Sequence, residues 1–267
     1  MSTLLRIAPA LPFRSGRAGR LVERNLMVYR RTWMIIFSGF FEPLFYLAGI
    51  GFGIGSLVGS VSGPDGKAIS YAVFVAPALM ASAAMNGAIY DSTFNIFYKL
   101  KYARTYEAVL TTPVGVGDVA VGEVAWALIR GSLYALGFMV VALVLGLVRS
   151  PLGLLALPAA MLIGFAFAAV GMAAATFVRK WQDFDFVQVV LLPMFLFSAT
   201  FYPLTAYPAA LQDLVALTPL YRGVHLLRAL FLGEPGPELL VDVAYLAAMG
   251  LVGVTIVARR LEGLLLK

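Results

Sequence analysis

Four ionisable residues lie inside long apolar stretches of this sequence, where chemistry could take place: Glu42, Asp91, Arg130 and Asp242. Burying a charge in apolar surroundings is costly, so such groups are functional suspects. Asp91 and Arg130 lie toward the same end of two consecutive stretches, and we expect them to form a salt bridge. Asp242 opens the last stretch, where the helix dipole favours a carboxylate and no further role is needed.

Glu42 is the deepest of the four, and Pro43 follows it directly. Proline removes a hydrogen bond from a helix and bends it. The pair therefore indicates either a hinge or polar contact beside a transport path, or a protonated carboxyl group that hydrogen-bonds a neighbouring helix. We treat Glu42, Pro43, Asp91 and Arg130 as candidates for such a path.

Catalytic and metal-binding patterns are missing from the sequence. It has one histidine and no cysteine, so we expect no metal site, no cofactor bound by this chain and no enzymatic activity. No stretch fits the phosphate-binding loop consensus, so ATP hydrolysis is not expected here either. His225 stands three residues from both Arg222 and Arg228, which indicates either a lipid-headgroup patch or ordinary interfacial polar residues.

The composition shows what kind of element holds these residues. Of the 267 residues, 61% are hydrophobic and 13% are charged, with a mean hydropathy of +0.89, far from the balance of a soluble domain. A membrane-spanning helix needs about 20 apolar residues. Stretches that qualify are 33–58, 71–97, 124–148, 152–178, 186–204 and 239–258. The sequence therefore predicts an all-α membrane protein with six transmembrane helices in a domain at 33–258.

Lysine and arginine are distributed so that the orientation can be predicted. They concentrate in 1–32, in the loops near 99–104 and 179–180, and in the tail 259–267. Cytoplasmic segments carry this excess, so both termini are expected in the cytoplasm and the protein in the plasma membrane. The net charge of +6 is then a topology signal, and no nucleic-acid partner is expected.

The segment 1–32 contains an amphipathic pattern. At helical spacing, Ala18, Val22, Leu26 and Tyr29 share a face opposite the basic one. The basic face consists of Arg17, Arg20, Arg24 and Arg31. The pattern predicts a helix at the cytoplasmic interface in contact with membrane lipids; the alternative is a basic flank with no fixed shape.

The segment 99–112 is a candidate docking element. Its side chains of interest are Lys99, Lys101, Tyr102, Arg104, Tyr106 and Glu107. Thr112-Pro113 stops a helix, and Asp118 is placed to cap the next one. A short, well-bounded helix in a loop longer than a turn requires is suited to a soluble partner.

The segment 205–238 is apolar but interrupted by Pro208, Pro219 and Pro235. Two short helices that enter the outer leaflet and return would fit this pattern. Because irregular backbone at such depth must be buried in protein or line a cavity, we expect this outer hairpin to pack against the bundle.

Three stretches resemble the permease subunits of type-2 ATP-binding-cassette exporters, and within them the nodulation-type lipooligosaccharide (NodJ-like) branch. They are "NLMVYRRTW" into "SGFFEPLFYLAGIGFGIG", "YDSTFNIFYKLKYARTYEAVLTTPVGVGDVAVGEVAWALIRG" and "FSATFYPLTAYPAALQDLVALTPLYRGVHLLRALFLG". They cover most of the chain between Asn25 and Gly233.

The resemblance implies that 99–112 holds a coupling helix, which seats in a cleft of a separate ATPase subunit, and that the basic helix also touches that ATPase. It implies two permeases, in a homodimer or with a related chain, and two ATPase subunits that hold ATP and Mg. It implies a bacterial inner-membrane exporter of an amphipathic substrate such as a glycolipid, a lipooligosaccharide or a hydrophobic drug.

Two other functions remain open at this point. One is a proton-coupled secondary transporter that uses Glu42 and Asp91 as proton carriers. The other is a membrane enzyme acting on lipid, which would need a clustered set of carboxylates, a nucleophile or a metal site that the sequence does not offer.

Overall fold

The structure is a computed structural model that describes residues 15–31, 41–63, 66 and 68–265. Outside this described part lie residues 1–14 of the N-terminal segment, positions 33–40 of the first predicted span, and Lys67.

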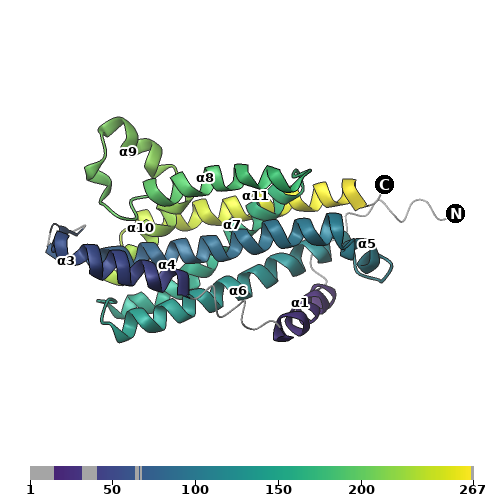
Figure 1. Cartoon of the computed structure of the whole chain (residues 1–267), viewed down its shortest axis with the longest axis horizontal. Helices are drawn as coiled ribbons and strands as arrows, with labels where there is room; N and C mark the ends of the chain where they lie inside the picture. The colour runs from purple at the N-terminus through teal and green to yellow at the C-terminus, as the bar shows by residue number, and fades with distance from the viewer. Residues whose placement is uncertain (1–14, 32–40, 64–65, 67, 266–267) are drawn as a thin grey trace.

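The described chain is almost entirely helical (Figure 1). Its first half contains α1 (Ser15–Arg31), a helix over Phe41–Val58 that includes the π-helix η2 (Leu47–Ile54) and α3 (Gly55–Val58), the paired strands β1 (Ser60–Ser62) and β2 (Ala68–Ser70), α4 (Tyr71–Tyr90), the π-helices η3 (Asp91–Asn95) and η4 (Tyr98–Tyr102), α5 (Thr105–Leu110) and α6 (Val116–Val144). The second half contains η5 (Pro151–Leu155), α7 (Ala156–Ala175), η6 (Trp181–Asp183), α8 (Phe184–Phe197), η7 (Leu204–Ala206), α9 (Ala209–Ala216), α10 (Pro219–Leu232) and α11 (Glu238–Leu265).

Among the described residues, 5 helices are long and apolar enough to cross a membrane. They are Phe41–Val58, Tyr71–Tyr102, Val116–Val144, Pro151–Ala175 and Glu238–Leu265. These helices support the predicted all-α integral membrane protein. The sixth predicted span, 186–204, falls on α8, whose 14 residues extend about 21 Å at 1.5 Å per residue. A sixth crossing therefore stays a prediction.

α4 is the central helix of the bundle. Nearly all of its residues are buried, and it packs against α6, α7, α10 and η2. Small residues make the close packing possible: a Cβ on Gly171 of α7 would come within 2.3 Å of Ser92 Oγ, and one on Gly253 of α11 within 2.8 Å of Ala169. The tight packing fixes where the polar side chains of α4 point.

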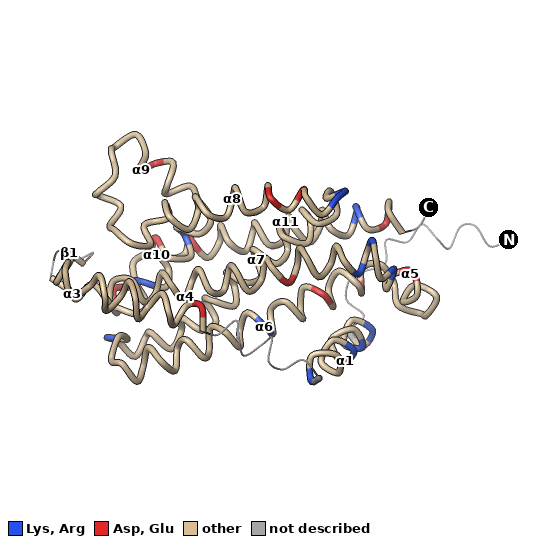
Figure 2. The backbone as a smooth tube through the Cα atoms, in the orientation of Figure 1, with Lys and Arg blue, Asp and Glu red and all other residues tan. Residues whose placement is uncertain are grey.

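The two ends of the bundle differ. α1, α5 and the C-terminal end of α11 lie at one end, whereas α3, the β1–β2 pair and α9 lie at the other (Figure 1). Many of the Lys and Arg positions cluster at the α1–α5 end (Figure 2). We call this end, formed by α1, η4 and α5, the basic end.

The segment 99–112 is not the single helix that we expected. The helical path of α4 continues through η4 to Tyr102, and Arg104 then adopts a left-handed backbone with φ of 44°. The chain reverses there, so only the 6 residues of α5 form a separate helix. α5 ends before Thr112-Pro113, as predicted, and Gly115 N–H donates to Asp118 Oδ2 at 3.0 Å, which confirms the predicted cap of α6.

The outer hairpin contains the two helices that the sequence predicts, α9 and α10. α10 begins at Pro219, where the Thr218 side chain accepts a bond from Tyr221 N–H at 3.3 Å, and ends at Gly233 with φ of 80°. Its buried face packs against α4, α7 and α11, which confirms the expected packing on the bundle. Its entry into a membrane stays a prediction. α11 extends further than expected, because 259–265 of the predicted tail continue the helix.

Candidate functional site

The predicted salt bridge between Asp91 and Arg130 is present. Arg130 Nη1 pairs with Asp91 Oδ1, and both side chains are largely buried. The same carboxylate oxygen accepts a bond from Asn95 Nδ2 at 3.2 Å, and Arg130 Nη2 donates to Tyr134 Oη at 3.0 Å. A buried charge pair is stable only when its remaining hydrogen-bonding groups are also satisfied. Asn95 and Tyr134 each supply one such hydrogen bond to this pair.

Tyr29 brings α1 into this network. Its hydroxyl donates to Asp91 Oδ1 at 3.3 Å and accepts from Arg130 Nη1 at 3.0 Å. Burial, and then the charge of Asp91, raise the pKa of Tyr29 to about 12, so its hydroxyl keeps its proton at neutral pH. The network therefore joins α1, the α4–η3 junction and α6 through one oxygen atom. We call Tyr29, Asp91, Asn95, Arg130 and Tyr134 the first ion-pair network.

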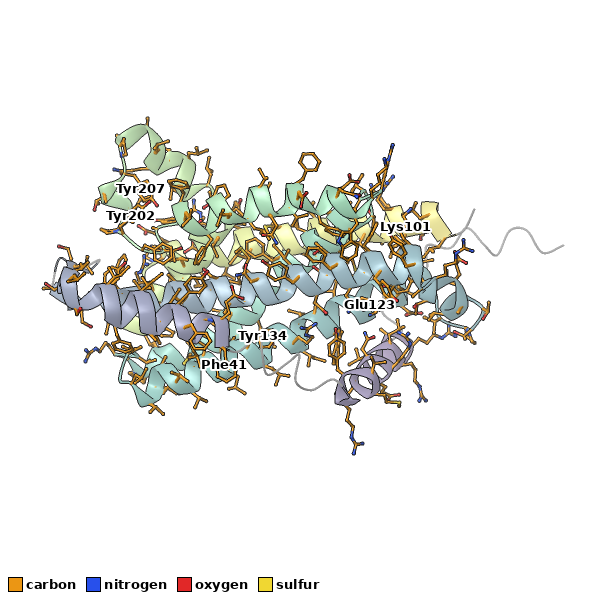
Figure 3. All side chains as sticks on the ribbon, viewed as in Figure 1. Phe41, Lys101, Glu123, Tyr134, Tyr202 and Tyr207 are labelled. Carbon is orange, nitrogen blue, oxygen red and sulfur yellow. The ribbon has the colours of Figure 1, made fainter. Side chains whose placement is uncertain are left out.

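A second buried ion pair lies closer to the basic end. Lys99 Nζ lies 2.7 Å from Glu123 Oε2, with side chains 9% and 1% exposed. Asn25 of α1 donates to Glu123 Oε2 and accepts from Lys99 Nζ, both at 3.2 Å. In Figure 3, Glu123 lies nearer to α1 along α6 than Tyr134 does. Lys99 therefore forms a buried ion pair within this chain. We expected its side chain to be exposed for contact with a partner.

Sequence reasoning missed Glu123, Asn25 and Tyr29, although one signal was available. On the helical path that continues α4 through η3 and η4, Lys99 follows Asp91 by eight residues, and on the antiparallel α6, Arg130 follows Glu123 by seven. Antiparallel neighbours pair positions whose numbers have a nearly constant sum, so an acid and a base on each helix at nearly equal spacing predict two pairs together.

The other docking candidates divide into buried and exposed side chains. Tyr106 is buried, whereas Lys101, Tyr102 and Arg104 are exposed. Glu107 is exposed as well. Four-residue spacing would place Tyr98, Tyr102 and Tyr106 on one side of a continuous helix, but the structure separates them: Tyr98 and Tyr102 stack on each other, while Tyr106 is buried in the core.

α1 is the predicted helix, but its buried face is used differently from our expectation. Ala18, Leu21 and Asn25 pack against α6, whereas Leu26, placed on the apolar stripe from the sequence, is 59% exposed. α6 accommodates the contact with Gly122, where a Cβ would lie 2.9 Å from Leu21 Cβ.

Three arginines of α1 face away from this contact. Arg17, Arg20 and Arg24 are exposed. Arg17 Nη1 donates to the carbonyl oxygen of Pro113 at 2.7 Å, which ties α1 to the turn after α5. The side chain of Arg31 lies outside the described residues.

A cavity of about 260 Å³ lies beside the first ion-pair network. Its wall includes Glu42, Pro43 and Arg130, so three of the four transport-path candidates share it, and the fourth, Asp91, pairs with Arg130. Asn86 and Gln188 add further polar groups to the same wall. We call it the central cavity.

The opposite end holds the remaining candidates. Asp242 is fully buried and binds Arg222 Nη1 at 3.2 Å and His225 Nδ1 at 2.6 Å. Our expectation that Asp242 needs no role beyond the helix dipole is therefore wrong, because it joins α10 to α11. Arg228 instead points to backbone carbonyls, with Nε 3.3 Å from the oxygen of Phe74 and Nη2 2.8 Å from that of Ala199.

A bundle of membrane-length helices with buried ion pairs at its centre defines a multi-pass integral membrane protein. The chain belongs to the ABC-2 type transporter family, which matches residues 18–232. It is similar to Nodulation protein J of Rhizobium leguminosarum bv. viciae, with 32% identity over 90% of this chain and 93% of the relative. Nodulation protein J of Rhizobium meliloti (strain 1021) is 32% identical over 85% of each chain.

These relatives confirm the resemblance seen in the sequence, and a third, Nodulation protein J of Rhizobium leguminosarum bv. trifolii, is 34% identical over 80% of each chain. The protein is thus a transporter membrane subunit, and membership of the family implies an ATPase subunit as its partner.

Proposed function

We propose that this chain is the permease of an exporter that moves an amphipathic, lipid-like substrate outward, using ATP hydrolysed on a separate subunit. The substrate class is a glycolipid, a lipooligosaccharide or a hydrophobic drug. The observation that carries the proposal is the linkage of the basic end to the central cavity through two successive buried ion pairs.

The basic end is suited to contact the ATPase. Lys101, Tyr102, Arg104 and Glu107 are exposed around the reversal at Arg104, and the arginines of α1 stand beside them through the Arg17–Pro113 bond. A movement of this surface would reach Lys99, five residues before the reversal at Arg104, because η4 continues the helical path of α4.

The two ion pairs then carry the movement inward. Asn25 and Tyr29 of α1 each join one of the pairs between α4 and α6, so α1, α4 and α6 move together at this end. Arg130 belongs both to the first ion-pair network and to the wall of the central cavity. A shift of α4 and α6 together against the Phe41–Val58 helix and α8, which complete the wall, would therefore change the cavity, as expected of a gating step in which packed elements switch between discrete arrangements.

The assembly that we propose has two permeases and two ATPase subunits, with ATP and Mg held by the latter. The basic end faces the cytoplasm of a bacterial cell, and the chain lies in the inner membrane. Region 186–204 serves as the sixth crossing, with α9 and α10 as a re-entrant outer hairpin. The exposed apolar residues of α8, among them Phe186, Val189 and Val190, are compatible with lipid or with a second permease.

Site-specific crosslinking tests the proposed docking surface, because the chain has no cysteine and a single introduced thiol has no background. Lys101→Cys and Arg149→Cys place a thiol on exposed basic positions at the two ends. With a bifunctional reagent in native membranes, the thiol at position 101 should crosslink to a Walker-motif ATPase and the thiol at position 149 should not. Equal crosslinking from both, or from position 149 alone, would refute the placement.

A further inference from the structure

A second cavity, of about 470 Å³, lies at the end opposite the basic end. α10 contributes Tyr221, His225 and Arg228 to its wall, and the first turn of α11 contributes Glu238. Sites for small ligands typically measure about 300–1,000 Å³ and combine apolar walls with a few placed polar groups. We call it the outer cavity.

Arg228 is the unusual member of this wall. It is 8% exposed, and its guanidinium lies 3.9 Å from the centre of the Phe74 ring. Within the described part of the chain it forms no ion pair, whereas Arg222 and His225 on the same helix both share Asp242. Two carbonyl oxygens accept from Arg228, but they supply no opposite charge, and a buried charge normally has one. An anionic group in the outer cavity would supply it.

The rest of the wall restricts which charges a bound ligand can carry. Glu238, whose side chain is 80% exposed, stands at the rim, and Glu234 also lines the cavity. Carboxylates disfavour a ligand that carries only negative charge, and a neutral sugar would leave Arg228 without a counter-charge. A headgroup with a phosphate at one end and a cationic amine at the other matches both signs.

The surroundings favour a lipid over a free solute. Leu239 lines the cavity, and the next residues of α11, Leu240 and Val241, are 74% and 55% exposed on a membrane-length helix. Acyl chains of a lipid whose headgroup sits at Arg228 would lie along this apolar surface. We infer that the outer cavity binds the zwitterionic headgroup of a phospholipid, with the phosphodiester at Arg228 and the amine at Glu238. The inference does not depend on the proposed export function.

Lipid retention by the purified full-length chain tests this site. Protein freed of lipid is mixed in detergent with equal amounts of phosphatidylethanolamine and phosphatidylglycerol of the same acyl chains, and native mass spectrometry measures the bound lipid. We expect phosphatidylethanolamine to dominate and Arg228→Gln to reduce its binding about tenfold, because a charge-assisted hydrogen bond is lost. Arg149→Gln, which removes the same charge at the same end outside this cavity, should bind as the wild type does.

Two further arms keep the result interpretable. Glu238→Gln alters an exposed side chain, so it should fold, and it should lose the preference for phosphatidylethanolamine over phosphatidylglycerol even if Arg228→Gln does not fold. Soluble phosphoethanolamine should compete with the lipid better than inorganic phosphate does. Unchanged lipid binding in Arg228→Gln, an unchanged preference in Glu238→Gln, or equal competition by inorganic phosphate would overturn the inference.

Discussion

At the scale of single residues, polar contacts rather than isolated charges organise the interior. Asp91 and Lys99 of the α4 path meet Arg130 and Glu123 of α6, and each pair is joined by one side chain of α1. Asp91 and Lys99 both fall in π-helical turns, which are frequent at functional sites. The Asp91–Arg130 pair was predictable because its members interrupt apolar stretches. Glu123 was not identified because it stands one position before the predicted span at 124–148.

Removing one partner of the Lys99–Glu123 pair should destabilise the protein strongly. Lys99→Met or Glu123→Gln each leaves an uncompensated buried group, and we expect a loss of about 3–5 kcal/mol in the free energy of unfolding. Thermal unfolding in detergent measures the change. Lys101→Met, two residues away and exposed, should change it by less than about 0.5 kcal/mol.

The double variant sharpens this prediction. Lys99→Met with Glu123→Leu removes both charges, so its loss should be clearly smaller than the sum of the single losses. Additive losses would show that the two side chains do not interact in the folded protein.

Ionisation of Tyr29 should lower the stability of the folded protein at alkaline pH. Its folded-state pKa is raised to about 12 from an ordinary 10.0, so its stabilising contribution is complete below pH 10 and falls as the pH rises toward 12. The stability difference between the wild type and Tyr29→Phe should therefore shrink over that interval. Chemical denaturation of both proteins at a series of pH values measures it; a constant difference across the interval would contradict the assignment.

At the scale of elements, the helices follow from the sequence more readily than their ends. Apolar stretches located α4, α6, α7 and α11, because burial of an apolar surface dominates at that length, while an amphipathic pattern located α1 and the proline-interrupted segment located α10. The reversal at Arg104 was hidden, since a left-handed backbone at a non-glycine residue is imposed by tertiary packing and has no local signature. For the same reason the segment 99–112 was predicted as one helix.

The contact between α1 and α6 depends on Gly122. A Cβ there would lie 2.9 Å from Leu21 Cβ and 3.0 Å from the Ala18 carbonyl oxygen, so Gly122→Ala should force α1 outward and cost about 1–3 kcal/mol. Gly117→Ala is the matched control, because nothing lies within 4 Å of its added Cβ. The thermal unfolding temperature should fall in Gly122→Ala and not in Gly117→Ala. An equal change in the two variants would contradict this packing.

The surface around Arg104 should be needed for coupling but not for folding. Replacing Tyr102 and Arg104 together with glutamate alters exposed side chains and reverses the charge there, so the variant should insert normally but lose ATP-driven transport. Membrane insertion and partner binding are measured side by side, with Arg149→Glu as the control at the opposite end. Normal partner binding and transport would place the docking surface elsewhere.

At the scale of the whole molecule, we propose that the basic end and the central cavity are mechanically coupled. In this proposal, movement at the basic end is transmitted through the two buried ion pairs along α4 and α6 and changes the central cavity. The membrane class and the family were predictable from hydropathy and from the three resembling stretches. The meeting of Glu42, Pro43 and Arg130 at one cavity was not, because it depends on how distant helices pack.

The most direct test is to purify the tagged protein from its own membranes in mild detergent and to identify, with stoichiometry, what accompanies it. The proposed export function predicts a Walker-motif ATPase at one copy per permease, lost when Tyr102 and Arg104 are replaced with glutamate. A homo-oligomer with no ATPase in any mild detergent would contradict it, and would favour a proton-coupled transporter in which Glu42 is the first residue to change.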